Sequence, residues 1–445
     1  MPIAPRSRLA TIPVGVLLVV AATPVAGAPL RAAAPETTRV AVTSTGVESD
    51  FGSGTVVLSA TGRFVAFESF GTNLVAGDGN MHYDVFVRDR KTRKLERVSL
   101  SGAGAEGDGG DSYKPAISAS GRFVAFFSEA TNLVAGDGNG LGDIFVRDRK
   151  THRTTRVDVA SEGAEANDFS TTPGISANGR FVVFMSSASN LVADDGNGMR
   201  DVFVHDRVTH ETTRVSVADD GTEGDGDSLL PESQSTISGS GRWVVFSSAA
   251  TNLVAGDTNG HFDVFIRDRK TRTTRRLSVT STGAQADGDS IAPVISPNGR
   301  YVVFTSSADD LVAGDTNGTA DVFVHDRKTH ETTRVDLTSD GTEAQRGGQS
   351  GCISADGRLV VFQSPSDDLV LHDTNQASDV FLRDRKLGTT TRISVGPADV
   401  EGDKESYRCA LSANGRFAGF VSDATNLVGD DHNTSQDGFV RGPLR

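Results

Sequence analysis

The stretch Ser118–Ser128, "SASGRFVAFFS", decides the fold, because six further versions of it occur along the chain. Each version has a short turn of the form Ser-x-x-Gly-Arg, followed by an apolar run. The arginines of the seven copies are Arg63, Arg122, Arg180, Arg242, Arg300, Arg358 and Arg416. They lie 59, 58, 62, 58, 58 and 58 residues apart. A repeat of this period over nearly the whole chain indicates one domain built from seven units.

Each unit has the pattern of four β-strands, as its second copy shows. The four candidate strands are residues 114–120, 122–128, 143–148 and 154–159. The second of them, "RFVAFFS", is apolar on both faces, as expected for a strand between two packed layers. Thr and Val in "TTRVDV" favour extended backbone. Seven units of four antiparallel strands predict an all-β fold, a seven-bladed β-propeller.

The two ends of the repeat region complement each other. The last unit ends with "DGFVRGPLR" (437–445) and lacks a fourth strand, whereas "TTRVAV" (37–42) is an extra copy of that strand. Arg39 precedes Arg63 by 24 residues, the same separation as between Arg156 and Arg180. We therefore expect the N-terminal strand to complete the seventh blade, and the propeller to span residues 37–445.

These repeats resemble the WD-like repeats of TolB-type β-propellers. The resemblance rests on the hairpin "ISASGRFVAF" (117–126) and the strand "DIFVRD" (143–148), and it covers all seven units. It implies a propeller fold. TolB of the Tol–Pal system has six blades and a separate N-terminal domain, so the resemblance does not extend to a role in that system. Seven-bladed relatives of prolyl oligopeptidases and of oligogalacturonate lyases carry similar repeats, but no hydrolase domain follows the repeats here.

The composition and the N-terminus indicate an exported, soluble protein. Among 445 residues, 37% are apolar and the net charge is −14. This charge argues against nucleic acid as a partner, because a phosphate backbone requires a basic surface. Two arginines precede the apolar run 11–23, which is shorter than a membrane span. We expect a signal peptide over residues 1–28 (cleaved between 26 and 34), a linker over 29–36, and a secreted, periplasmic or cell-envelope monomer without a membrane span.

The two faces of the predicted disc differ in charge. In the second unit, the long loop 128–143 contains three acidic residues and no Lys or Arg. The segment 147–156 contains five basic residues, Arg147, Arg149, Lys150, Arg153 and Arg156. This pattern predicts an acidic face formed by the long loops and a basic face formed by the short turns. The alternative is that the alternating charges only keep both faces of the disc soluble. Four extra residues within "SLLPESQS" (228–235) break the symmetry on the long-loop side.

One set of polar residues recurs in every unit with the pattern Asp-x-Asn-x3-Asp. The seven copies are Asp78, Asn80 and Asp84; Asp137, Asn139 and Asp143; Asp195, Asn197 and Asp201; Asp257, Asn259 and Asp263; Asp315, Asn317 and Asp321; Asp373, Asn375 and Asp379; and Asp431, Asn433 and Asp437. These oxygens are candidate calcium ligands, although an EF-hand does not fit, because a strand separates Asp143 from Asp148. The alternative is architectural, with Asp and Asn forming the turn that begins the third strand. The sequence favours the turn, and calcium is the one candidate cofactor.

The two cysteines lie in the first strands of the last two units. Cys352 precedes Arg358 by six residues, and Cys409 precedes Arg416 by seven. This difference of one residue points the two side chains to opposite faces of their blades, and hence toward each other. We expect a disulfide in an exported protein, with two separate buried thiols as the alternative. The aromatic residues that follow the turn arginines, Phe64, Phe123, Phe181, Trp243, Tyr301 and Phe417, are expected to pack between blades.

No nucleophile motif, catalytic triad or His metal-ligand spacing occurs, so no catalytic residue is predicted. We expect a non-catalytic propeller that binds a protein or glycan ligand at its acidic long-loop face. One alternative is a glycan-active, lyase-like enzyme with a site in the central channel, and another is a calcium-stabilised cell-envelope module. An enzyme should gather unlike polar residues at one side of the channel mouth, whereas a scaffold should keep near-equivalent loops around the ring.

Overall fold

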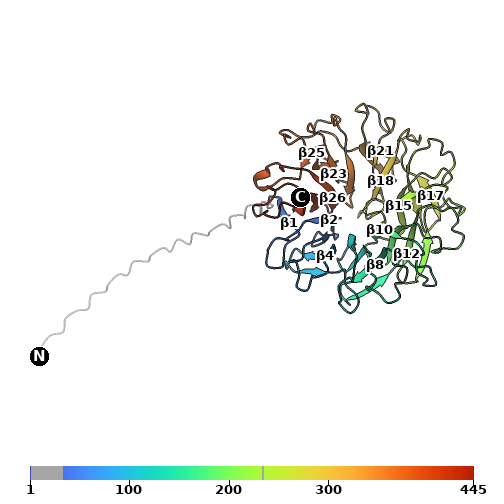
Figure 1. Ribbon diagram of the computed structural model, residues 1–445. Coiled ribbons are helices and arrows are strands. Elements are labelled where there is room, and N and C mark those ends of the chain that lie inside the picture. The colour runs from blue at the N-terminus through green and yellow to red at the C-terminus, as the bar shows by residue number, and fades with distance from the viewer. Residues whose placement is uncertain (2–33, 233–234, 445) are drawn as a thin grey trace. The chain divides into compact units, whose positions relative to one another are not determined.

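The computed structural model contains seven four-stranded antiparallel sheets that surround a central axis (Figure 1). This is the predicted all-β, seven-bladed propeller. The structure describes residue 1 and residues 34–232 and 235–444, so the predicted signal peptide and most of the predicted linker lie outside the described residues. No helix within the described ranges is long and apolar enough to cross a membrane. A short 3-10 turn, η1 (Pro397–Asp399), precedes blade 7.

Within blades 1 to 6 the strands follow chain order from the central axis outward, and in blade 7 β1 is the outermost strand. Blade 1 contains β2 (Ser53–Leu58), β3 (Phe64–Ser69), β4 (Asp84–Asp89) and β5 (Leu95–Arg97); blade 2 contains β6 (Ser112–Ile117), β7 (Phe123–Ser128), β8 (Asp143–Asp148) and β9 (Arg153–Arg156); blade 3 contains β10 (Ser170–Ile175), β11 (Phe181–Ser186), β12 (Asp201–Asp206) and β13 (Glu211–Arg214). Blade 4 contains β14 (Ser228–Leu229), β15 (Trp243–Ser248), β16 (Asp263–Asp268) and β17 (Thr273–Arg276); blade 5 contains β18 (Ser290–Ile295), β19 (Tyr301–Ser306), β20 (Asp321–Asp326) and β21 (Glu331–Arg334). Blade 6 contains β22 (Gln349–Ile353), β23 (Leu359–Ser364), β24 (Asp379–Asp384) and β25 (Thr389–Arg392); blade 7 contains β26 (Ser406–Leu411), β27 (Ala418–Ser422), β28 (Asp437–Gly442) and β1 (Glu36–Arg39).

Blade 7 combines the two ends of the repeat region, as predicted. β1 pairs antiparallel with β28, with Thr38 opposite Val440. β1 begins at Glu36, one residue before the predicted start. The Thr37 hydroxyl donates a hydrogen bond to the Val395 carbonyl of blade 6 at 2.6 Å, so the closing strand also contacts the preceding blade.

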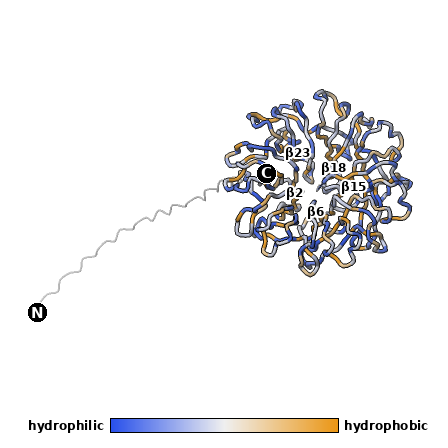
Figure 2. Tube along the Cα trace, viewed as in Figure 1, coloured by the Kyte–Doolittle hydropathy of each residue, from blue (hydrophilic) through white to orange (hydrophobic). Residues whose placement is uncertain are grey.

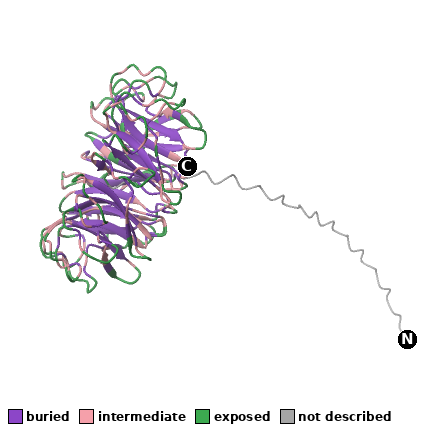
Figure 3. Ribbon diagram, turned by 90° about the vertical axis from the view of Figure 1, so that its right-hand side faces the viewer, coloured by how far each residue is buried: buried purple, intermediate pink, exposed green. Residues whose placement is uncertain are grey.

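The apolar core lies between neighbouring blades. Phe126 and Phe145 of blade 2 are fully buried with ring centroids 5.9 Å apart, and an equivalent Phe pair stacks in every blade. The blade 2 pair packs against valines of blade 1, including Val85 and Val87, and seven such clusters are present around the ring. Figure 3 shows the strands buried and the loops exposed, and Figure 2 shows hydrophobic segments recurring in each blade. Burial of the apolar surface between neighbouring blades stabilises the ring.

In the six blades where an aromatic residue follows the turn arginine, its ring packs against the next blade, which confirms the prediction. A Cβ added to Gly121 of blade 2 would lie 2.3 Å from the Phe64 ring, and Gly121 also has a positive φ of 75°. The Arg149 guanidinium of blade 2 lies 4.7 Å from the centroid of the Phe64 ring. The turn glycine is therefore required both by the backbone conformation and by the ring that rests on it.

Hydrogen bonds between the short turns encircle the channel. The Ala60 N–H donates to the Ala119 carbonyl at 3.1 Å, and the same bond joins the turns of blades 2 and 3, 3 and 4, 4 and 5, and 6 and 7. Pro297 of blade 5 has no N–H, and the Asn298 side chain replaces it by donating to the Ala355 carbonyl at 2.6 Å. The Asn414 N–H then donates to the Ala60 carbonyl at 3.1 Å and closes the ring.

The inner strands bulge near the long-loop end of the channel. In blade 2, Tyr113 pairs with Phe127 and Ala116 with Ala125, so one extra residue interrupts the ladder. The bulge residue has a positive φ in five blades, where it is Lys114, Thr172, Ala292, Ser350 or Arg408. In blade 4 the four-residue insertion lies at the position of the bulge. It falls between Leu229, which pairs with Ser247, and Ile237, which pairs with Val244. It therefore lies within the inner strand and not in the loop before that strand.

Candidate functional site

The asparagines of the Asp-x-Asn-x3-Asp motif form joints between neighbouring blades. In blade 2, Asn139 Oδ1 accepts a hydrogen bond from the Leu141 N–H at 2.7 Å, and Asn139 Nδ2 donates to the Ala166 carbonyl at 2.9 Å. Ala166 belongs to the loop that leads to blade 3. All seven asparagines make both contacts. These residues therefore have the architectural role, since each forms an Asx turn that is tied to the next blade.

An arginine lies between the two aspartates of each motif. In blade 2, Arg156 Nη1 lies 3.0 Å from Asp143 Oδ2 and 3.6 Å from Asp137 Oδ1, and it also pairs with Glu165. The arginines at this position are Arg39, Arg97, Arg156, Arg214, Arg276, Arg334 and Arg392. In blades 1 to 6 the arginine contacts both aspartates. The assignment of Arg156 to the basic face was therefore wrong, because its strand carries it to the acidic, long-loop end.

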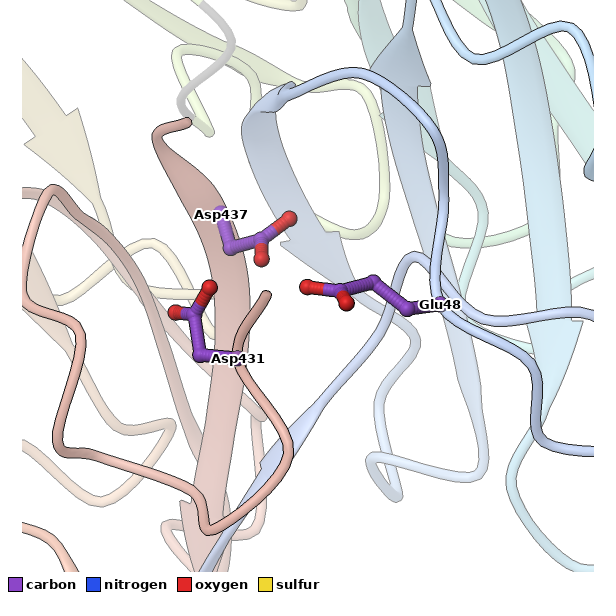
Figure 4. A group of neighbouring side chains, drawn as sticks. All are labelled: Glu48, Asp431 and Asp437. Carbon is purple, nitrogen blue, oxygen red and sulfur yellow. The ribbon is translucent and has the colours of Figure 1, made fainter. Parts of the chain in front are cut away.

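The joint of blade 7 contains residues from both ends of the repeat region (Figure 4). Asp431 and Asp437 point toward Glu48, which follows β1, and their carboxylate oxygens lie within 4.8 Å of one another. Arg39 pairs with Glu48, and its Nε lies 3.4 Å from Asp437 Oδ2. The His432 N–H also donates to Glu48 at 3.1 Å. The joint thus fastens β1 to the last blade in addition to the strand pairing.

Each joint has more carboxylates than cations. Burial, reinforced by the second aspartate of the motif, raises the pKa of Asp315 and of Asp373 to about 7. Three carboxylates within 4.8 Å of one another occur in blades 2, 5, 6 and 7. Such a set binds calcium when the space between the oxygens is free. Here a guanidinium lies among them, so the residues fit an ion pair better than a calcium ion, and calcium binding at the motif positions stays a prediction.

The residue two positions after the joint arginine divides the joints of blades 1 to 6 into two kinds, and it is Ala41 in blade 7. It is serine in blades 1, 3, 4 and 6, where, for example, the Ser216 hydroxyl donates to Asp201 Oδ1 at 2.5 Å. In blades 2 and 5 it is Asp158 or Asp336, each fully buried with one carboxylate oxygen that has no hydrogen-bond partner. Burial, together with the neighbouring aspartate of the motif, raises the pKa of Asp158 and of Asp336 well above the ordinary value. These two joints therefore favour a proton where the joints of blades 1, 3, 4 and 6 have a hydroxyl.

Arginines of the short-turn face also have partners within the fold. Arg122 forms two parallel hydrogen bonds with Asp148, at 2.8 and 2.6 Å, which hold the turn of blade 2. Arg147 is buried and donates to the Ser101 carbonyl of blade 1 at 2.8 Å. Arg149 covers Phe64, as described above. Much of the basic character of this face is therefore used inside and between blades.

The channel is apolar below its mouth. A cavity of about 160 Å³ is lined by inner-strand residues such as Val57, Ile117 and Ile353, together with Cys352 and Cys409. The Sγ atoms of the two cysteines lie 2.7 Å apart, and both residues are free thiols in this structure. Two sulfur atoms at this distance are closer than ordinary non-bonded contact but farther apart than the bonded distance of ~2.05 Å. The cysteines meet across blades 6 and 7 as expected, and the disulfide itself stays a prediction.

At the long-loop mouth of the channel, unlike residues occupy equivalent positions. The bulge position holds Thr55, Lys114, Thr172, Ala292, Ser350 and Arg408 in blades 1, 2, 3, 5, 6 and 7. Lys114 and Arg408 therefore flank Thr55 of blade 1. Arg408 Nη1 donates to Thr55 Oγ1 at 2.5 Å, and Lys114 Nζ donates to Thr171 Oγ1 at 3.2 Å.

Glu232, from the insertion of blade 4, contacts both of these cations. Its Oε1 lies 3.1 Å from Lys114 Nζ, and its Oε2 lies 3.5 Å from Arg408 Nη2. The side chains of Glu232 and Arg408 are about half exposed, whereas that of Lys114 is 18% exposed. A residue of blade 4 thus reaches blades 2 and 7, and the mouth contains a charged cluster that no other blade repeats.

Glu68 completes this cluster from the second strand of blade 1. Its Oε2 accepts a hydrogen bond from the Lys114 N–H at 2.7 Å, and its Oε1 accepts one from the Thr55 N–H at 3.2 Å. Arg408 Nη1 lies 3.7 Å from Oε1. Burial raises the pKa of Glu68. Gly54 leaves the space for this carboxylate, because a Cβ at that position would lie 2.5 Å from Oε1.

The sequence reasoning missed these mouth residues. The available signal was the position eight residues before the turn arginine, where Lys114 and Arg408 are charged while the other repeats have uncharged residues. The insertion is visible in the repeat spacing, but nothing in the sequence links its acidic residue to these cations. The predicted motif residues, in contrast, are distributed around the ring, and the structure brings them together only within each joint.

No protein-family model and no curated protein matches this chain. Several solved structures are similar to it. The oligogalacturonate lyase from Vibrio parahaemolyticus has a TM-score of 0.51 at 11% identity, covering 92% of this chain and 97% of that one. The β-propeller domain of the Trilobed protease from Pyrococcus furiosus also has a TM-score of 0.51 at 11% identity, covering 89% and 96%. A putative TolB from Agrobacterium tumefaciens has a TM-score of 0.41 at 17% identity, covering 79% and 95%. TolB proteins are thus among the similar structures, and the likeness extends to the propeller fold alone.

Proposed function

We propose that this chain is an exported, non-catalytic binding propeller of the cell envelope or the extracellular space. Its ligand, a protein or a glycan, would contact the long-loop mouth of the channel. The observation that supports this proposal is the cluster of Glu68, Lys114, Arg408 and Glu232, which departs from the sevenfold repeat. Polar side chains on a rigid scaffold, beside an opening, are typical of a ligand-binding surface.

The joints also favour the channel mouth as the binding site, because the charges of the joints are already paired within the fold. Their aspartates are paired with arginines and their asparagines are engaged by backbone, so the joints have little to offer a ligand. The side chains of Arg408 and Glu232 are about half exposed, whereas those of the joint residues Arg156 and Asp143 are only 10% and 0% exposed. A partner that approaches the long-loop face therefore meets solvent-exposed charged side chains at the mouth and buried ion pairs around it.

The test compares two faces of the propeller. The full exported chain, the double variant Lys114→Glu/Arg408→Glu and the control Lys150→Glu would be applied to a glycan array and to immobilised envelope proteins. Lys150 is exposed on the short-turn face. We expect the double variant to lose binding at least tenfold and the control to bind as the unmodified chain does. A ligand that the double variant still binds, and that Lys150→Glu does not, would contradict the proposal.

A second function, a glycan-active enzyme, is favoured by one observation. Unlike polar residues gather at one side of the channel mouth, as an enzyme would require, and Glu68 is a buried carboxylate with a raised pKa beside the Arg408 guanidinium. Such a group is suited to proton transfer. Incubation with acidic polysaccharides, followed by ultraviolet absorbance of unsaturated products, tests a lyase reaction. Activity that Glu68→Gln abolishes would establish the enzyme, and absence of product across the substrates would leave the binding function.

A further inference from the structure

We propose that Lys114 and Arg408 form a binding site for the carboxylate of a small acidic ligand, and that Glu232 occupies this site in the structure. The inference rests on the proposed binding function of the channel mouth and names the chemical group that is recognised. The two oxygens of Glu232 divide between the two cations, at 3.1 Å from Lys114 Nζ and 3.5 Å from Arg408 Nη2. A ligand carboxylate can take the same position, because it presents the same two oxygens.

The backbone holds both cations in place. Lys114 and Arg408 have φ values of 53° and 54°, a backbone conformation that residues other than glycine adopt at a cost in energy. A polar side chain of the preceding blade accepts a hydrogen bond from each bulge N–H: Glu68 accepts from Lys114 at 2.7 Å, and Gln363 accepts from Arg408 at 2.8 Å. These contacts fix the points from which the two side chains extend over the mouth.

The pairing with Glu232 is not needed by the fold. Glu232 and Arg408 are about half exposed, and ion pairs of this exposure contribute only about 0.2–1 kcal/mol each to stability. The bulges of blades 3, 5 and 6 carry Thr172, Ala292 and Ser350, which have no charge. An inner strand of this propeller can therefore be built without a cation at the bulge, and the two that are present are available for recognition.

The charge and the neighbouring groups indicate what the site prefers. Apart from Glu232, the cluster has two cations and one buried carboxylate, Glu68, so an anion is favoured over a cation or a neutral group. The hydroxyls of Thr55 and Thr171 lie beside the cations and can hydrogen-bond to polar groups next to a ligand carboxylate. Because Glu232 competes from within the chain, the apparent affinity of a free carboxylate is reduced by the fraction of molecules in which Glu232 is bound.

The experiment measures binding of small acids to the full chain by calorimetry or NMR titration. The probes are D-glucuronate and N-acetylglutamate, with glucose and N-acetylglutamine as neutral counterparts, so that a sugar acid is distinguished from an amino acid. We expect weak binding of at least one acid to the unmodified chain, and roughly three- to tenfold tighter binding to Glu232→Gln. Adding Lys114→Met or Arg408→Met to Glu232→Gln should remove the binding.

Lys150→Met, on the opposite face, serves as the matched control and should leave the affinity unchanged. Melting temperatures of all variants establish that the fold is retained. Equal binding of acids and neutral counterparts, or no binding of either acid to Glu232→Gln, would overturn the inference. The proposed function would survive that result if the Lys114→Glu/Arg408→Glu variant still lost the ligand found on the array, so the two failures are distinguishable.

Discussion

The seven joints and the channel mouth lie on the same face of the propeller but use charge in opposite ways. At each joint, an arginine is enclosed by aspartates, and the arrangement recurs from blade to blade. At the mouth, Lys114 and Arg408 occur once each, and their partner Glu232 comes from an insertion in a third blade. The charges that recur in each blade therefore hold the blades together, whereas the charges that occur only once are not required by the fold.

The largest expected effect is the loss of a joint arginine. Arg334→Met should destabilise the protein by about 3–5 kcal/mol, because it leaves Asp315 and Asp321 buried without their cation. Urea denaturation measures the change. Arg275→Met is the control, since Arg275 is 62% exposed and pairs at the surface with Asp219. If both variants lost the same small amount of stability, the joints would not be structural.

The next effect concerns the channel, where two repeats depart from the others by carrying cysteine. If Cys352 and Cys409 form a disulfide in the oxidised protein, its reduction should destabilise the ring by about 2–4 kcal/mol. Mass spectrometry under non-reducing conditions, with and without an alkylating reagent, detects the bond directly. The Cys352→Ser/Cys409→Ser variant should have the stability of the reduced protein. Two alkylatable thiols in the unfolded chain, without a reducing agent, would show that the cysteines are separate.

A smaller effect distinguishes the two kinds of joint. Asp158→Ser should stabilise the protein by about 1–3 kcal/mol at pH 8, because it replaces a buried carboxylate oxygen without a partner by the hydroxyl found in four other blades. The pKa of Asp158 is raised in the folded state, so its contribution to stability is present below the ordinary pKa of Asp and is lost as the pH rises. The gain should therefore shrink toward pH 4.

The reciprocal change, Ser216→Asp in blade 3, provides the matched comparison. It should destabilise the protein at pH 8 and have less effect at pH 4, since it puts a second carboxylate next to Asp201. Denaturation curves at the two pH values measure both variants. Effects of Asp158→Ser and Ser216→Asp with the same sign would contradict the explanation.

The smallest expected effect is that of calcium. Because a guanidinium already lies among the joint carboxylates, we expect the melting temperature to be the same with calcium and with a chelator. Calorimetry measures both conditions. A melting temperature that rises with calcium and falls with the chelator would instead support the calcium-stabilised envelope module, and Asp373→Asn should then remove part of the rise.

The propeller could be predicted from the sequence because its determinants are local and repeated. The Ser-x-x-Gly-Arg turn and the extra strand predicted at 37–42 defined the blades and their closure, although β1 itself ends at Arg39. The joints were predicted only in part. The Asx turns follow from Asp and Asn within one loop, whereas Arg156 lies 13 residues after Asp143 and reaches it through strand pairing.

The mouth cluster could not be read from any one repeat. Lys114, Arg408 and Glu232 come from blades 2, 7 and 4, and only closure of the ring brings them together. Their positions in the sequence suggest no contact, and the insertion gives no indication of the direction in which it extends. Comparing the bulge position across all repeats would have identified the two cations, but not their partner.

The pairing of β1 with β28 makes the folding of this protein depend on its full length. Thr38 and Val440 are separated by 402 positions and meet in the same sheet. β1 is synthesised before β28 and therefore waits for it, and a chain that stops before β28 leaves both β1 and β27 with unpaired edges. Chains that lack β28 should consequently be cleaved by proteases at β1 and β27 faster than chains that contain it.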